Sequence, residues 1–422
     1  MTAIPTGLAP REFLRRLYGV AVDAADPAQC IPPALPPRPR GRAIVVGAGK
    51  AAAAMAAAVE GHWDGPLEGT VVTVPGAEVD CDRIEVRVAG HPLPAAEGVD
   101  AARSILERVR GLGPDDLVIV LLSGGGSALM PLPADGLALD DKQRVTRSLL
   151  LAGATIREIN CVRRHLSRIK GGRLAVACAP ARVVTLAISD VPGDDPVDLA
   201  SGPTVADPTT CADALEVLAR HGIALPAPAR AALESGRWES VKPGDPAVAA
   251  VDYRLVATPA HSLEAARAWA RSQGVEAEVV SDRLEGESRV VGAAMARLAA
   301  ARVPRPGAPH LLISGGETTV TVRGPGRGGP NVEFLLAFGL SLPADRAVHA
   351  IACDTDGVDG NAPVAGAIWT PGTVSRAAAL GLDPVRHLES NDAHSFFEAL
   401  GDSVVTGPTR TNVNDFRAIL LG

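Results

Sequence analysis

The segment Val46-Gly47-Ala48-Gly49-Lys50 places a lysine directly after two closely spaced glycines. The apolar run Ala43–Val46 comes before it and an alanine-rich run follows, which predicts a strand, a tight turn and a helix with Lys50 in its first turn. Glycines there let backbone N–H groups approach an anion. A bound anion would explain a lysine that opposes the helix dipole; the alternative is a plain turn with a solvated lysine. Lys50 is a candidate catalytic residue, and Gly47 and Gly49 are candidate ligand-binding residues.

Two well-known glycine motifs fit this segment poorly. A Walker A loop would need glycine at Ile44 and serine or threonine at Ala51. The dinucleotide fingerprint Gly-x-Gly-x-x-Ala is present and ends at Ala52, but the acidic residue expected after the second strand is missing, with Glu78 only a weak substitute. A nicotinamide cofactor therefore stays open as an alternative with little support.

Three consecutive glycines form a second candidate site. They follow the six-residue apolar run Leu117–Leu122, which predicts a buried strand. Exposed N–H groups in such a loop form a natural nest for phosphate, and a flexible turn is the alternative. A serine-hydrolase elbow is disfavoured because Leu129 stands where that motif needs glycine. The candidate nucleotide- or substrate-binding residues are Ser123, Gly124, Gly125, Gly126 and Ser127.

Clustered carboxylates follow two further predicted strands. Ser189–Asp195 comes after Val183–Ile188, and Asp354–Gly360 follows a strand over Val348–Ala352. The second group resembles a calcium loop only superficially, because Ala365 stands where an EF-hand needs glutamate. Mg²⁺ binds one or two carboxylates together with substrate phosphates, whereas ordinary turns use the same residue types. The candidate metal ligands are Asp190, Asp194, Asp354 and Asp356, with Asp190 also a candidate catalytic residue.

A second Ser-Gly-Gly follows the apolar residues Leu311–Ile313, and a run rich in glycine and arginine, 323–329, comes after it. Backbone N–H groups and a guanidinium there could reach one anion together, and a glycine-rich hairpin is the alternative. Ligands lie at the carboxyl ends of parallel strands, so we expect both Ser-Gly-Gly segments to face one cleft. The candidates are Ser314, Gly315, Gly316, Glu317 and, for catalysis, Arg327.

Alternating strand-like and helical runs must position these loops, which predicts an α/β protein with two lobes. We expect an amphipathic helix over 11–25 and a helix whose face carries Ile159, Val162, Leu166 and Ile169. The stretch Leu225–Asp245 is rich in Pro, Gly and Ala, which places the boundary there. The expected domains are 1–240, Rossmann-like with a mainly parallel sheet, and 241–422, a smaller α/β domain. Additional strands are expected at Val71–Val74, Ile84–Val88, Arg254–Ala257, Glu276–Val280 and His310–Ile313, and additional helices at Ser262–Gln273 and Glu287–Ala301.

Composition and charge exclude several classes of protein. The 422 residues carry a net charge of −7 and only 3% aromatic residues, which argues against a nucleic-acid partner. Six scattered cysteines fit reduced thiols better than a disulfide scaffold or a zinc site. The N-terminus has no long apolar stretch typical of a signal peptide, and no 18-residue apolar run occurs. We therefore expect a soluble cytoplasmic protein without a membrane partner.

Taken in order, these loops resemble the glycerate 2-kinases that carry a C-terminal MOFRL domain. The match begins near residue 11 and reaches the C-terminus. Each motif alone is weak, but the ordered set is highly specific. The matching segments are Val45–Lys50, His91–Pro94, Ser123–Leu129, Ile169–Leu174, Ser189–Asp194, Ala200–Thr204, Ser314–Val320, Asp354–Gly360, Asn391–Asp392 and Gly407–Asp415.

The resemblance implies a kinase that uses ATP and Mg²⁺ to convert D-glycerate to 2-phosphoglycerate. It also implies ligand-binding roles for Asn331 and Asn412, a smaller C-terminal domain of the MOFRL type, and a cleft between the lobes. Members have also been labelled hydroxypyruvate reductases, so an NAD(P)H-dependent reductase is the alternative. A non-catalytic protein that binds anions or nucleotides is a third reading, and a homodimer is left open.

One departure from the family pattern affects a catalytic residue. The family usually shows Gly-Gly-Arg-Asn-x-Glu, and this chain has Gly328-Gly329-Pro330-Asn331-Val332-Glu333. The resemblance gives that arginine a role in catalysis, which Pro330 cannot fill. Arg327, three residues earlier, is the candidate to take the role.

Overall fold

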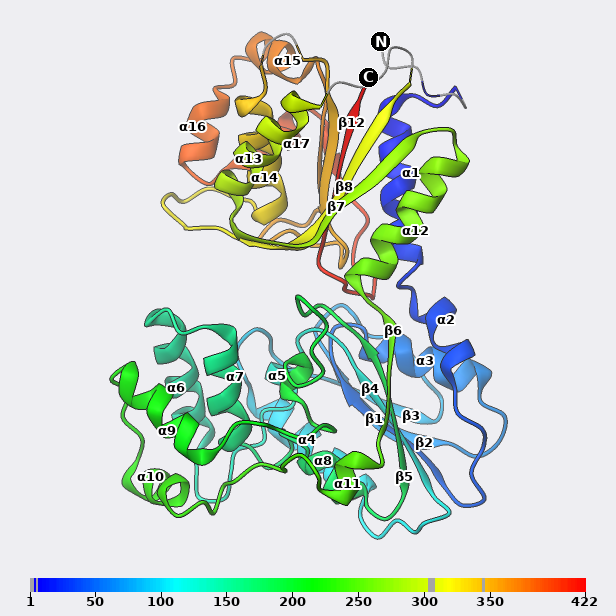
Figure 1. Ribbon diagram of the computed structural model, residues 1–422, viewed down its shortest axis with the longest axis vertical. Coiled ribbons are helices and arrows are strands. Elements are labelled where there is room, and N and C mark those ends of the chain that lie inside the picture. Colours follow the sequence, from blue (N-terminus) through cyan, green and yellow to red (C-terminus); the bar gives the residue numbers. More distant parts are fainter. Residues whose placement is uncertain (1–3, 5–6, 303–307, 344–345) are drawn as a thin grey trace. The chain divides into compact units, whose positions relative to one another are not determined.

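The computed structural model describes residues 4, 7–302, 308–343 and 346–422. The chain forms two compact units (Figure 1). The first unit is Pro27–Val256, and the second is Ala257–Gly422 together with the N-terminal residues as far as Asp26. This division differs from the expected one at residue 240, since 241–256 remain with the first unit. No helix in the described part of the chain is long and apolar enough to cross a membrane.

A six-stranded sheet forms the centre of the first unit. Its order is β3-β2-β1-β4-β5-β6, and the pairs from β3 to β5 are parallel. Every residue of β1 and β4 is buried, as expected for strands covered on both faces. This order is that of a doubly wound Rossmann-like sheet, as predicted. The strands are β1 Ala43–Ala48, β2 Glu68–Thr73, β3 Ile84–Val88, β4 Leu117–Leu122, β5 Arg182–Ile188 and β6 Asp252–Ala257.

The helices of the first unit divide into those that cover the sheet and a separate helical group. Helices α6, α7, α9 and α10 pack around their own core, which includes Leu149, Val162 and Leu218. Helix α7 ends at His165, so the predicted helix was too long: Ile169 belongs to the core under the sheet instead. The helices are α2 Pro27–Cys30, η1 Pro32–Ala34, α3 Ala52–His62, α4 Ala96–Arg108, α5 Gly126–Leu129, α6 Leu139–Leu151, α7 Ile156–His165, α8 Arg173–Cys178, η2 Leu199–Ser201, α9 Cys211–Arg220, α10 Ala227–Glu234 and α11 Pro246–Ala249.

The second unit has a mixed sheet in the order β11-β10-β9-β12-β8-β7. Only the β7–β8 pair is parallel; the remaining neighbours run antiparallel. Helices α1 and α12 cover one face of this sheet, and α13, α14 and α17 cover the other (Figure 1). The strands are β7 Glu276–Glu287, β8 His310–Thr319, β9 His349–Asp354, β10 Gly366–Trp369, β11 Ser403–Val404 and β12 Asp415–Leu421. The helices are α1 Pro10–Asp23, α12 Pro259–Ser272, α13 Ser288–Ala301, α14 Pro330–Ser341, α15 Thr373–Ala379, α16 Pro384–Glu389 and α17 Ala393–Ala399.

Two strands differ in their setting from the sequence expectation. The strand predicted at Arg254–Ala257 is present as part of β6, but it belongs to the first sheet and not to the second series of strands. The second Ser-Gly-Gly does not follow a strand but lies inside β8, where Ser314 pairs with Arg417 of β12 and Gly316 with Leu284 of β7. A Cβ added to Gly316 would come within 2.2 Å of the Leu284 nitrogen. These glycines therefore allow close strand packing and do not form an anion loop.

Candidate functional site

Three of the predicted loops lie at one edge of the first sheet. Strands β1, β4 and β5 are neighbours and run parallel, so the residues that follow them share the carboxyl edge. These residues are Gly49–Ala51, Ser123–Gly126 and Ser189–Asp195. The strand order reverses between β1 and β4, and ligands of such sheets bind outside this point. The fold therefore brings both glycine-rich segments to the expected binding position.

The loops after β1 and β4 are hydrogen-bonded to each other. The Lys50 N–H donates to the Gly124 carbonyl at 2.8 Å, and the Ala51 N–H donates to Ser123 Oγ at 3.0 Å. A Cβ on Gly49 would lie 2.0 Å from that same Oγ, so only glycine fits. Helix α3 begins at Ala52, which places Lys50 just before the helix and not in its first turn as predicted. Lys50 is partly exposed.

The glycines after β4 are required by close approach. Gly125 has φ of 80°, in the left-handed region that glycine adopts without penalty. A Cβ there would lie 3.1 Å from the His91 ring and 3.5 Å from Cγ of Lys50. Gly126 lies against Ala48, whose carbonyl oxygen would be 2.7 Å from an added Cβ. His91 thus belongs to this site, although the sequence pointed to it only as part of a family motif.

The loop after β5 contributes carboxylates to the same edge. Ser189 Oγ accepts the Val191 N–H at 3.2 Å, and the Asp194 N–H donates to the Val191 carbonyl at 2.9 Å, which forms a tight turn. Asp194 has φ of 57°, and its Oδ1 is buried without a hydrogen-bond partner among the described residues. A buried carboxylate oxygen of this kind is a suitable ligand for a hard cation such as Mg²⁺, and Asp190 lies in the same loop.

The other two predicted metal ligands belong to the second unit. Asp354 Oδ1 accepts the Asp356 N–H at 2.9 Å, and Asp356 Oδ1 accepts the Val358 N–H at 2.9 Å. Both carboxylates thus stabilise the turn after β9, which is the alternative weighed from the sequence. Asn412 acts similarly in the loop before β12, where its Oδ1 accepts the Asn414 N–H at 3.1 Å.

Asn331 and Pro330 form the start of helix α14. The Asp359 carboxylate accepts the N–H groups of Asn331 and Val332 at 3.0 and 2.8 Å, so it caps the helix. Asn331 Nδ2 also donates to Asp415 Oδ1 at 2.6 Å, and the residue is fully buried. These bonds give Asn331 a structural role, but its Oδ1 is buried without a hydrogen-bond partner among the described residues, and the ligand-binding role expected of it stays a prediction. Pro330 takes the first helical position, where its missing N–H costs nothing.

Arg327 lies beside a pocket of about 240 Å³ in the second unit. Its N–H donates to Asp392 Oδ1 at 3.0 Å, and its Nη2 is 2.8 Å from His394 Nε2. The side chain is 52% exposed, so solvent reaches the guanidinium. Desolvation lowers the pKa of His394, which favours a neutral ring that can accept from Arg327. The pocket is lined by Gly326, Gly328, Gly329, Pro330, Asn361 and Asn391, among others.

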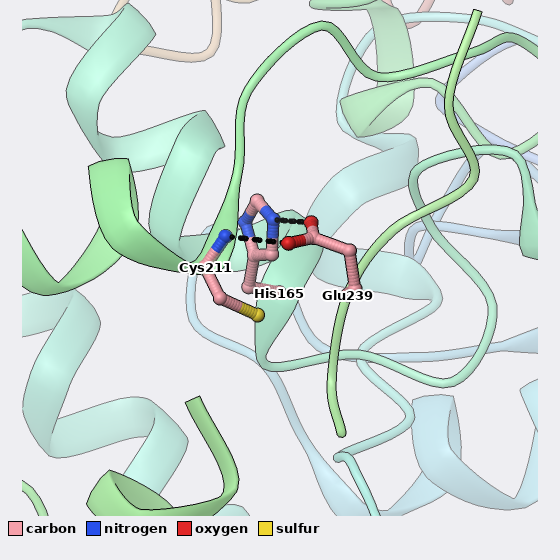
Figure 2. Close-up of side chains that lie close together, drawn as sticks. All are labelled: His165, Cys211 and Glu239. Carbon is pink, nitrogen blue, oxygen red and sulfur yellow. Dashed lines mark hydrogen bonds and ion pairs between the residues drawn. The ribbon is translucent and has the colours of Figure 1, made fainter. Parts of the chain in front are cut away.

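Three potential metal donors also lie together away from these loops, at His165, Cys211 and Glu239 (Figure 2). His165 Nε2 is 3.0 Å from Glu239 Oε1, and the Cys211 N–H donates to Glu239 Oε2 at 3.1 Å. The Lys242 ammonium lies 2.6 Å from the same Oε1, and burial raises the pKa of the Cys211 thiol to about 11. A lysine thus already neutralises this carboxylate, and the cluster joins α7, α9 and the segment after α10.

Comparison with known proteins gives a consistent set of relatives. Residues 13–234 match a domain of unknown function, DUF4147, and residues 310–415 match the MOFRL family. D-glycerate 2-kinase from Thermotoga maritima is 38% identical, over 94% of each chain, and human glycerate kinase is 34% identical over 99% of this chain and 94% of its own. A putative hydroxypyruvate reductase from Agrobacterium vitis is 50% identical over 98% of this chain and 95% of its own.

A solved structure agrees with these sequence matches. The crystal structure of glycerate kinase from Thermotoga maritima has a TM-score of 0.88 and 35% identity, and it covers 98% of this chain and 99% of its own. The likeness extends over both units.

Proposed function

Because the chain belongs to the glycerate kinase family that carries a MOFRL domain, we propose that it transfers the terminal phosphoryl group of ATP to the 2-hydroxyl of D-glycerate. The observation that carries this proposal is the pair of hydrogen-bonded glycine loops at the reversal point of the first sheet, with Lys50 beside them. The kinase names and kinase structure among the relatives support the same reaction.

Phosphoryl transfer depends on positioning and charge neutralisation more than on covalent chemistry of the protein. The backbone N–H groups of Gly124–Gly126 are suited to bind phosphate oxygens, and Lys50 is suited to stabilise the charge that develops on the transferred group. Asp190 and Asp194 are the proposed Mg²⁺ ligands, and the cation would neutralise phosphate charge when bound.

Arg327 is the proposed arginine of the second unit for the same reaction. Its guanidinium is half exposed and held by His394, which leaves it able to approach an anion. Ser314–Gly316 are left out of the proposed site, because strand pairing accounts for them.

The reductase reading rests on the names of two relatives and on the spacing of Gly47, Gly49 and Ala52. A dinucleotide site of this fold usually places an acidic residue at the end of the second strand, where it binds the ribose. Strand β2 ends here at Thr73, whose Oγ1 donates to the Lys50 carbonyl at 3.2 Å, and Val74 follows. This strand end therefore favours the kinase.

One assay that offers both reactions tests the proposal. The protein is given ATP, Mg²⁺ and D-glycerate in one arm, and NADH or NADPH with hydroxypyruvate in the other. We expect ADP formation that requires D-glycerate and Mg²⁺. Oxidation of the reduced nicotinamide without ATP would overturn the proposal in favour of the reductase, and nucleotide binding without turnover in either arm would favour a binding protein.

A further inference from the structure

Two buried lysines and a partly exposed arginine of the first unit lie near enough to influence one another electrostatically, and we call Lys142, Arg163 and Lys170 the basic cluster. Lys142 and Lys170 are 2% and 1% exposed. The Lys142 ammonium donates to the Leu166 carbonyl at 3.0 Å, and the Lys170 ammonium donates to the Ala200 carbonyl at 3.3 Å. An ammonium has three donors, so each lysine keeps two without an acceptor in the described chain.

The charged groups that act on these lysines are other cations. Burial and then the neighbouring Arg163 and Arg173 lower the pKa of Lys142 to about 7. Burial, followed by Lys142 and Arg163, also lowers the pKa of Lys170 well below its ordinary value. No carboxylate in the described ranges forms an ion pair with the basic cluster. An uncompensated buried charge is strongly unfavourable, so the fold alone gives no reason for two buried lysines beside a partly exposed arginine.

The residue next to Arg163 shows how this fold compensates a buried cation. Arg164 is 3% exposed, its Nε lies 3.0 Å from Asp207 Oδ2, and its Nη1 lies 3.5 Å from Asp198 Oδ1. Two carboxylates therefore neutralise Arg164, and none neutralises Arg163 one residue earlier on the same helix. The lack of a carboxylate partner in the described part of the chain is therefore specific to the basic cluster and is not shared by the neighbouring Arg164.

The basic cluster adjoins the glycine loop through a strained turn. Ala200, Ser201 and Gly202 all have left-handed φ values, of 51°, 60° and 59°, which are unfavourable for the two residues that are not glycine. This turn presents the Ala200 carbonyl to Lys170 and places Ser201 Oγ 2.8 Å from Ser127 Oγ. Backbone strain of this kind persists where the surroundings enforce it, and here it connects Lys170 to the loop after β4. Ser127 and Arg163 are partly exposed, so solvent reaches this side.

We propose that Lys142, Arg163 and Lys170 bind the oxygens of a small anion beside Ser127. A guanidinium and two ammonium groups suit a carboxylate or a phosphate. The choice between carboxylate and phosphate rests on the proposed function. In that function the acceptor is a hydroxy-acid, and Lys50 with the glycine loop already binds phosphate. The carboxylate of D-glycerate is then the expected occupant, and a nucleotide phosphate is the other source of the same chemistry.

The site is tested by measuring ligand binding in the absence of turnover, with calorimetry and with thermal melting. The probes are D-glycerate, orthophosphate and glycerol, which lacks the carboxylate. The variants are Lys170→Met, Lys142→Met and the milder Arg163→Gln. Arg168→Met is the matched control, because Arg168 lies in the same segment but is 52% exposed and pairs with Asp135.

We expect D-glycerate, but not glycerol, to bind the wild-type protein and raise its melting temperature. Each cluster variant should weaken D-glycerate binding at least tenfold, whereas Arg168→Met should bind normally. If the cluster variants lose orthophosphate binding but keep D-glycerate binding, the basic cluster binds a nucleotide phosphate and not the carboxylate of D-glycerate. Unchanged binding of both anions in folded Arg163→Gln and Lys170→Met would overturn the site. A kinase assay that fails while anion binding depends on the cluster would refute the proposed function and leave the anion site intact.

Discussion

Two buried basic regions of the molecule are compensated differently: the surroundings of Arg417 in the second unit, and those of Lys142 and Lys170 in the first. In the second unit Arg417 is fully buried, yet its guanidinium bonds to the Asp415 carboxylate and to Thr318 Oγ1 at 3.0 Å. Asp415 also accepts from Asn331 at 2.6 Å. In the first unit Lys142 and Lys170 are nearly as buried, and within the described part of the chain their hydrogen-bond partners are carbonyl groups. The paired charges serve the fold, whereas the unpaired ones are expected to serve a ligand.

This contrast predicts that the largest loss of stability follows when the buried ion pair of Arg417 and Asp415 is broken. Arg417→Ala would leave Asp415 buried without its cation and would remove the guanidinium from the Phe334 ring, 4.8 Å away. Breaking a buried pair on one side typically costs about 3–5 kcal/mol. Denaturant unfolding should show a loss of this size. A loss below about 1 kcal/mol would mean that the pair contributes little to the fold.

Lys50 should show the opposite behaviour, with a large effect on activity and a small one on stability. If it stabilises the transferred phosphoryl group, Lys50→Ala should lower kcat/KM with ATP and D-glycerate by two orders of magnitude or more, roughly 3 kcal/mol. Its melting temperature should stay near that of the wild type. Lys50→Arg should recover part of the activity, since charge is restored without the same reach. Near-normal turnover of Lys50→Ala would make the lysine a solvated surface residue.

Asp359 should make the second unit less stable as pH rises. Burial raises the pKa of this carboxyl from 3.8 to about 7, so its protonated form is favoured in the folded state. Its contribution to the free energy of unfolding is present below about pH 4 and is lost as pH rises to about 7, by an amount on the order of 4 kcal/mol. Asp359→Asn keeps an oxygen for the cap of α14 and should flatten this part of the stability profile. An unchanged profile would show that Asp359 ionises normally.

Lys142 should make the free energy of unfolding depend on pH at higher pH values, and its substitution should have the smallest effect of the four. Its pKa is lowered to about 7 from 10.5, so its stability contribution is present above about pH 10.5 and is lost as pH falls to about 7. Lys142→Met should remove this loss and stabilise the ligand-free protein near pH 7 by about 1 kcal/mol. Equilibrium unfolding at pH 7 and pH 10 measures the difference. A destabilised Lys142→Met at both pH values would mean that the ammonium serves the fold.

Much of the first sheet was predictable because β1 and β4 are continuous apolar runs and β3 alternates apolar with charged residues. Ile84–Val88 and Leu117–Leu122 were predicted with the ends that the structure has. Local sequence could not separate the two Ser-Gly-Gly segments. Ser123 leads into a third glycine and α5, whereas Ser314 continues a strand because β7 and β12 pair with it on both sides. That pairing depends on residues distant in the chain: Leu284 of β7 lies 32 positions before Gly316, and Arg417 of β12 lies 103 positions after Ser314.

The site was predictable only in part for the same reason. Glycine spacing located the loops after β1 and β4. Local pattern did not mark Lys142 or Lys170 as buried, and Lys170 stood out only as part of the family segment Ile169–Leu174. Their importance arises from burial and from the absence of a nearby carboxylate, which only the packing of α6, α7 and the Ala200 turn creates. The capping bond between Asn331 and Asp359 was not predictable from local sequence, because the two residues lie 28 positions apart in the chain.

The most direct test of the kinase account is ³¹P NMR of a reaction that contains the protein, ATP, Mg²⁺ and D-glycerate. We predict loss of the terminal ATP resonance and a new phosphomonoester signal split into a doublet by the single proton on C2, as 2-phosphoglycerate requires. A triplet would place the phosphate on the 3-hydroxyl. Unchanged ATP resonances, while the same preparation consumes NADH with hydroxypyruvate, would contradict the account.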